Sequence, residues 1–189
     1  MNRVSSEHNF RYMKLNQHLF DWKQIVSCRF LSLTLPQISG LATWSFGMVM
    51  TRSSSVTQVS SLMAKINAEP ENTVRQRLKE WYKSGSAKSK KGNKRASVEV
   101  SECFSSLLEW IIDLLPQTTT ELPIAIDATS IGQNFTVLSV NVLYRRCAIP
   151  IAWKVVQGTS KGSIETLLAK TISIFQRCCA KDMEGNCQC

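Results

Sequence analysis

Histidine, tyrosine and acidic residues are scarce in this chain of 189 residues. It has 2 histidines, 3 tyrosines and 14 acidic residues, against 23 lysines and arginines. Both histidines, His8 and His18, fall in the first predicted helix, far from the cysteines near the carboxyl terminus. The sequence also has no glycine-rich phosphate loop, serine nucleophile elbow or dinucleotide-binding fingerprint, so it gives no support to those enzyme classes.

A long uninterrupted apolar run is missing as well. Residues 30–51 carry no charge, but Pro36, Gln37 and Gly40 interrupt them. The apolar stretches that remain are too short to cross about 30 Å of hydrocarbon. We therefore expect no membrane partner, and two buried helices joined near Pro36.

The cysteines do not fit a secreted disulfide scaffold. There are 7 of them, an odd number, and no signal-peptide pattern is present. Cys28, Cys103 and Cys147 stand alone in apolar segments, which predicts buried thiols in a reducing cytoplasm. The remaining four, near the carboxyl terminus, lack the ligand spacing that is typical of zinc sites.

The composition favours a folded protein with a polyanionic partner. Hydrophobic residues make up 43% of the chain, enough for a packed core. The formal net charge of +9 favours nucleic acid, the commonest polyanion. An ordinary basic protein without such a partner is the alternative.

Residues 1–83 are predicted to be helical. Apolar residues recur at spacings of three and four, as on one face of a helix. Pro36 should end or bend the helical segment before it, and a third helix is expected over residues 37–50. Ser53–Ser55 are candidates for the N-cap of a further helix. Asn67 is the candidate residue for its C-terminal end, because asparagine tolerates the left-handed conformation found there.

The helices expected at residues 55–66 and 70–83 suggest a helix-turn-helix, whose second member would lie in a DNA groove. Pro70 fits the first turn of that second helix. A helical hairpin with a basic solvated face is the alternative. The predicted contacts to bases and phosphates are Arg75, Gln76, Lys79 and Lys83.

Residues 84–97 form a basic linker and the clearest domain boundary. The stretch has no acidic and no large apolar residue, so it cannot bury a face. Exposed cations give salt-dependent affinity for DNA without sequence preference, although a solubilising tether would have the same composition. The predicted DNA-binding cations here are Lys88, Lys90, Lys91, Lys94 and Arg95.

Residues 98–175 are expected to form an α+β unit. A helix should run over 98–115 until Pro116 stops it. A nearly continuous apolar run, 122–126, predicts a strand covered on both faces. The period-two runs 137–144 and 149–156 predict a hairpin with residues 145–148 as its loop, the second run placing alternate apolar residues on one face. A further helix is expected over 164–175.

Asp127 is the candidate catalytic and metal-binding residue. It follows the strand 122–126 directly, so a carboxylate is expected at the carboxyl end of a central strand. Phosphoryl transfer on nucleic acids commonly uses divalent ions held by several carboxylates, and Mg²⁺ prefers oxygen ligands. A single aspartate cannot hold such a centre, and an aspartate in a turn after a strand is the structural alternative.

The segments Ile124–Ser130 and Pro150–Gly158, together with the strand between them, resemble the DDE-type transposases of bacterial insertion sequences. The resemblance covers roughly residues 37–163. It implies a ribonuclease-H-like fold, Mg²⁺ as cofactor and binding of transposon-end DNA. Asp127 matches the first residue of the family's Asp, Asp, Glu triad. Glu165 comes too early for the glutamate, and Asp182 and Glu184 lack the expected context.

The resemblance therefore implies an α+β chain with an incomplete ribonuclease-H-like core at 98–175 and a divergent, cysteine-rich tail at 176–189. Such a chain would bind transposon ends without cutting DNA, with itself or a full-length transposase as a further partner. The alternatives are a non-enzymatic regulator of a transposase and an unrelated basic structural or RNA-binding protein. An unpaired apolar edge is expected at 122–127. It predicts that the catalytic half is unstable alone, whereas residues 37–83 fold as a helical unit.

Overall fold

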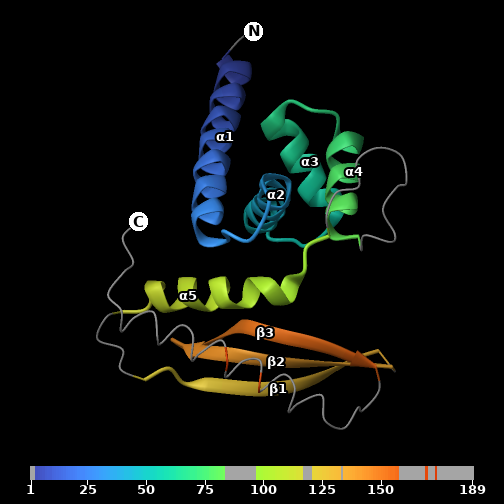
Figure 1. Ribbon diagram of the computed structural model, residues 1–189. Coiled ribbons are helices and arrows are strands. Elements are labelled where there is room, and N and C mark those ends of the chain that lie inside the picture. The colour runs from blue at the N-terminus through green and yellow to red at the C-terminus, as the bar shows by residue number, and fades with distance from the viewer. Residues whose placement is uncertain are drawn as a thin grey trace. The chain divides into compact units, whose positions relative to one another are not determined.

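The computed structural model describes residues 3–83, 97–116, 121–132 and 134–157, together with residues 169 and 173 (Figure 1). The chain divides into two units, Met1–Glu99 and Val100–Cys189. The described residues form five α-helices and a three-stranded antiparallel sheet, so the α+β expectation is confirmed. The tail at 176–189 lies outside them, as does almost all of the helix expected over 164–175. None of the described helices is long and apolar enough to cross a membrane.

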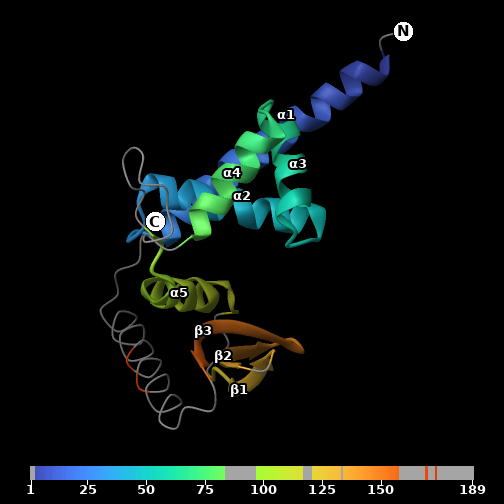
Figure 2. The ribbon, with the colours of Figure 1, turned by 90° about the vertical axis from the view of Figure 1, so that its right-hand side faces the viewer.

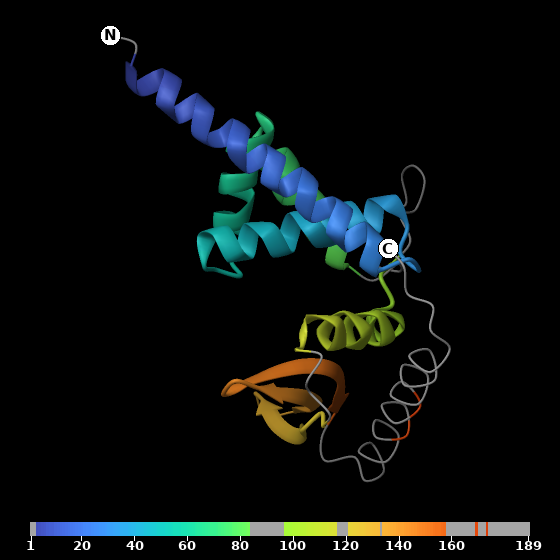
Figure 3. The same cartoon turned by 90° about the vertical axis from the view of Figure 1, so that its left-hand side faces the viewer.

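The helical unit contains α1 (Arg3–Arg29), α2 (Leu35–Thr51), α3 (Val56–Asn67) and α4 (Glu71–Tyr82). Figure 3 shows α1 as one long helix that runs past the other three. Its Leu19 is buried in the same core as the apolar residues of α3 and α4. The unit is therefore larger than the expected residues 37–83. The buried residues of this core are Leu19, Val59, Met63, Ala64, Ile66, Val74 and Leu78.

Pro36 begins a helix and does not end one. α1 already stops at Arg29, and Pro36 occupies the first turn of α2, where a missing backbone N–H leaves no helical hydrogen bond unmade. Gln37 secures this start, because its Oε1 accepts from the Thr34 backbone N–H and from Thr34 Oγ1, each at 2.8 Å. The join between the two helices thus precedes the proline.

The left-handed stop of α3 is Ala68, one residue later than expected. Ala68 has φ 53°, and its backbone N–H bonds to the Ala64 carbonyl oxygen, whereas Asn67 is still helical. We expect Ala68→Gly to raise the free energy of unfolding by about 1 kcal/mol, because glycine adopts this conformation without strain. Urea unfolding measures the gain. Asn67→Gly is the control and should be destabilising; a loss for Ala68→Gly would contradict the left-handed stop.

In the part of the second unit that the structure describes, an α-helix packs against one sheet. A 3-10 turn (Val100–Cys103) leads into α5 (Phe104–Leu114), and the strands are β1 (Ile124–Ile131), β2 (Phe135–Tyr144) and β3 (Cys147–Gln157), in the order β1-β2-β3. Figures 1 and 2 show α5 lying over one face of the sheet. Leu138, Val140 and Val142 lie at alternate positions of β2 and are all buried, which confirms the period-two pattern expected for this strand. The buried core residues are Phe104, Leu108, Ile111, Leu138, Val140, Val142, Ile151 and Ala152.

The expected single apolar face of β3 is interrupted by a bulge. Val140 pairs with Ala152, but the next residue of β2, Asn141, pairs with Pro150, so Ile151 is the extra residue. As a result the consecutive residues Ile151 and Ala152 are both buried, which strict alternation does not allow. Val155 is 56% exposed, so it does not share the buried face.

β1 is not covered on both faces, and this expectation was wrong. Ile124 is 42% and Ile126 50% exposed, because β1 is an edge strand of the described sheet. β1 also continues to Ile131, so Asp127 lies within the strand and not at its end. Residues 124–127 do pair with 139–142 of β2, as the resemblance requires.

Two of the three isolated cysteines are not buried. Cys28 and Cys147 are exposed, and only Cys103 is partly covered. The apolar neighbours of Cys28 and Cys147 in the sequence therefore did not indicate where their thiols lie.

Candidate nucleic-acid interface

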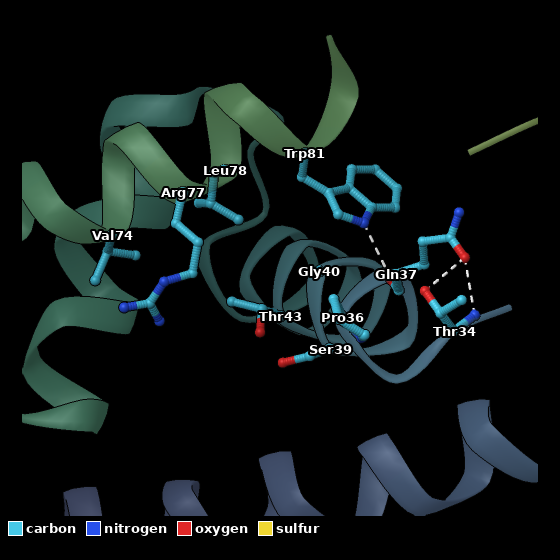
Figure 4. Close-up of a pocket in the computed structure, with 10 residues that line it drawn as sticks. All are labelled: Thr34, Pro36, Gln37, Ser39, Gly40, Thr43, Val74, Arg77, Leu78 and Trp81. Atoms are coloured by element: carbon cyan, nitrogen blue, oxygen red, sulfur yellow. Dashed lines mark hydrogen bonds between the residues drawn. The ribbon is translucent and has the colours of Figure 1, made fainter. Parts of the chain in front are cut away.

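The orientation of α4 is fixed by its packing against α3 and by its contact with α2. Val74 and Leu78 are buried in the helical core, and Trp81 Nε1 donates a hydrogen bond of 3.0 Å to the Gln37 carbonyl oxygen (Figure 4). The indole fits because Gly40 has no side chain: a Cβ there would lie 1.9 Å from Trp81 Cδ1. With its inner face held in this way, the opposite face of α4 has a defined position.

Three polar residues occupy that outer face. Asn72, Gln76 and Lys79 are exposed and follow one another at spacings of four and three, so their side chains lie in a row, called here the outer stripe. Amide and ammonium groups can bond both base edges and phosphates. Gln76 and Lys79 were predicted contacts. Asn72 was missed, although its spacing from Gln76 was a sufficient signal.

The other cations of α4 are partly neutralised by carboxylates. Lys83 Nζ donates a 2.7 Å hydrogen bond to Glu80 Oε1. The same carboxylate oxygen also accepts a 2.9 Å hydrogen bond from the uncharged Gln76 Nε2. Lys79 has no ion pair among the described residues. Exposed pairs are worth at most about 1 kcal/mol, so a phosphate can displace the carboxylates. The ion pairs are Arg75–Glu71, Arg77–Glu69 and Lys83–Glu80.

The side chain of Arg75 is less accessible to a nucleic acid than the side chains of the outer stripe. Its side chain is about one-third exposed and is held by Glu71 one turn earlier on the helix. Its Nε atom is buried without a hydrogen-bond partner. A nucleic acid would therefore reach the end of the guanidinium only after displacing Glu71.

The predicted basic linker is attached to the helical unit at both ends. Lys83, at the carboxyl end of α4, is the last described residue before it; on the far side, the Ser97 carbonyl oxygen accepts a 3.0 Å hydrogen bond from Gln37 Nε2. Gln37 thus binds Trp81 through its backbone and Ser97 through its side chain. The predicted contacts Lys88, Lys90, Lys91, Lys94 and Arg95 lie outside the described residues.

A pocket of about 270 Å³ lies between α2 and α4, on the inner side of α4 (Figure 4). No residue of the outer stripe lines it, so it does not add to the interface. Its lining residues are Thr34, Pro36, Gln37, Ser39, Gly40, Thr43, Val74, Arg77, Leu78 and Trp81.

Asp127 does not form a metal centre with the described residues. It is exposed in the middle of β1, pairs with Ser139, and its Oδ2 accepts a 2.8 Å hydrogen bond from Thr129 Oγ1. Within the described part of the chain, no group of three or more histidines, cysteines or acidic residues could hold a metal ion. One carboxylate and one hydroxyl do not provide the oxygen ligands that Mg²⁺ requires, so the described residues do not fit this cofactor.

No protein-family model matches this chain, and no curated protein or solved structure matches it either.

Proposed function

We propose that this chain is a DNA-binding protein of insertion-sequence transposition, one that binds transposon-end DNA through its helical unit and does not cleave DNA by itself. The outer stripe of α4 carries the proposal. Asn72, Gln76 and Lys79 are exposed in a row on a helix whose inner face is fixed by Val74, Leu78 and Trp81. This arrangement supports a recognition helix that enters the major groove.

The charge distribution supports the same reading. The chain carries a formal net charge of +9, and the cation-rich residues 84–97 follow α4 directly. Cations of this kind contact phosphates and supply affinity for any duplex. The stripe residues would then add sequence preference to that general affinity.

Substitution of the stripe tests the proposal. We expect Gln76→Ala to relax the preference for the element's terminal repeat over a scrambled duplex by about 1–3 kcal/mol, because a base contact is lost. Lys79→Ala should weaken binding to both duplexes equally and reduce the slope of log affinity against log salt by about 1. Fluorescence anisotropy with labelled duplexes measures both effects. Gln24→Ala, an exposed glutamine on α1, is the control and should change neither. Stripe variants that bind like the unaltered chain would exclude α4 as the interface.

Regulation of a full-length transposase is the second candidate function. It is favoured by the surroundings of Asp127, because no group of three or more histidines, cysteines or acidic residues within the described part of the chain could hold a metal ion. Expression of the chain with an active element should then lower the element's mobility, and the Lys79→Ala variant should lower it less. Unchanged mobility would favour an inert remnant. Cleavage of donor DNA by the purified chain with Mg²⁺ would contradict both readings, and stronger binding to RNA than to DNA would favour an RNA-binding protein.

A further inference from the structure

The connection between β2 and β3 is tighter than the expected loop 145–148. Tyr144 pairs with Cys147, so Arg145 and Arg146 alone make the turn. Their φ angles are 45° and 69°, both in the left-handed region. Two-residue hairpin turns of type I′ require this conformation at both central positions, and Asn-Gly meets the requirement with the least strain. The chain has two arginines there instead.

Local packing does not explain those arginines. Both side chains are exposed, and neither has an ion pair among the described residues. The Arg145 guanidinium lies over the Tyr144 ring, 5.2 Å from its centroid, a contact that is weak at an exposed site. A side chain with a Cβ atom is strained in the left-handed conformation. Strain that persists without a packing role points to a function for the strained residues.

We propose that the Arg145–Arg146 turn is a second contact site for nucleic-acid phosphates, distinct from the helical unit. The inference rests on the proposed DNA binding and adds a residue pair to it. The guanidinium of arginine donates two parallel hydrogen bonds to a phosphate, and the tight turn places two consecutive exposed arginines at the end of a hairpin. The contact reads no sequence, so it serves any duplex.

The test uses the full chain and a substitution that should improve folding while reducing binding. Arg145→Asn with Arg146→Gly creates the preferred type I′ turn. We expect its thermal midpoint to rise by about 5 °C because the strain is removed. We also expect the slope of log affinity against log salt, measured with duplex DNA, to fall by about 1.8, since each lost phosphate contact contributes about 0.9.

Two further variants separate charge from strain. Arg145→Gln with Arg146→Gln should reduce the salt slope by the same amount without raising the thermal midpoint. Arg145→Lys with Arg146→Lys should preserve both quantities. If the unaltered chain binds DNA and the Asn-Gly variant keeps its salt slope, the second site is refuted and the proposed function stands. A fall in the thermal midpoint of the Asn-Gly variant would refute the strained turn from which the site is inferred. A chain that binds no DNA overturns both proposals.

Discussion

Leu108→Ala is expected to unfold the sheet unit while the helical unit stays folded. Leu108 is completely buried in α5, where it packs with Val140 and Ile151 of the sheet. Truncating a buried leucine costs about 2–5 kcal/mol in lost burial and cavity formation. The free energy of unfolding of a small domain is only about 5–15 kcal/mol, and this unit also has an exposed apolar edge at β1. At the lower end of that range a loss of this size removes most of its stability.

Hydrogen exchange followed by peptide mass spectrometry distinguishes the two units. Peptides from β2 and α5 should lose protection in the Leu108→Ala variant, and peptides from α3 should keep it. Leu114→Ala is the matched control: Leu114 is on the same helix but 69% exposed, so its truncation should cost less than about 0.5 kcal/mol. Equal loss of protection in α3 would contradict two independently folding units.

Periodicity predicted the helices well and the sheet less completely. The boundaries of α3 and α4 were expected within a few residues, because apolar residues at helical spacing and start signals such as Pro70 are local features. The bulge at Ile151 was not predictable, since a period-two run does not reveal that one strand carries an extra residue. The length of β1 was underestimated: the strand was expected to end before Asp127, although residues 128–131 contain the strand formers Thr129 and Ile131.

The candidate interface was predicted in part. Gln76 and Lys79 were named because a basic helix suggested them, and the structure leaves both exposed. The Arg75–Glu71 pair was visible in the sequence as a four-residue spacing on one helix. The Arg77–Glu69 pair was not, because its partners are eight positions apart and Glu69 precedes the helix. The paired carboxylates make α4 less basic than its lysines and arginines alone suggest.

Gly40→Ala is expected to destabilise the helical unit and to weaken DNA binding with it. The new Cβ would meet Trp81 Cδ1 at 1.9 Å and Nε1 at 2.2 Å, so the indole must leave its place. Overpacking of this kind costs about 1–3 kcal/mol, and loss of the bond from Trp81 to Gln37 adds about 1 kcal/mol. The higher helix propensity of alanine compared with glycine offsets at most about 1 kcal/mol of this loss. A net loss of about 1–3 kcal/mol remains.

The effect on DNA follows from where the displaced indole sits. Trp81 belongs to α4, so movement of the indole shifts the outer stripe. The indole binds the backbone of Gln37, and the side chain of Gln37 binds Ser97 at one end of the basic segment. The same movement therefore shifts that end of the segment as well. Urea unfolding and anisotropy with duplex DNA measure the two losses. Ser39→Ala, at the exposed neighbouring position, is the control and should cost less than about 0.5 kcal/mol.

A double-mutant cycle isolates the cause. In a Trp81→Ala background the space beside Gly40 is free, so Gly40→Ala should cost little or become stabilising, and the coupling between the two positions should exceed about 1 kcal/mol. Additive losses would mean that the two residues do not touch. In that case the Trp81 indole would not help to orient α4 against α2, and the position of the outer stripe would depend on the packing of Val74 and Leu78 alone.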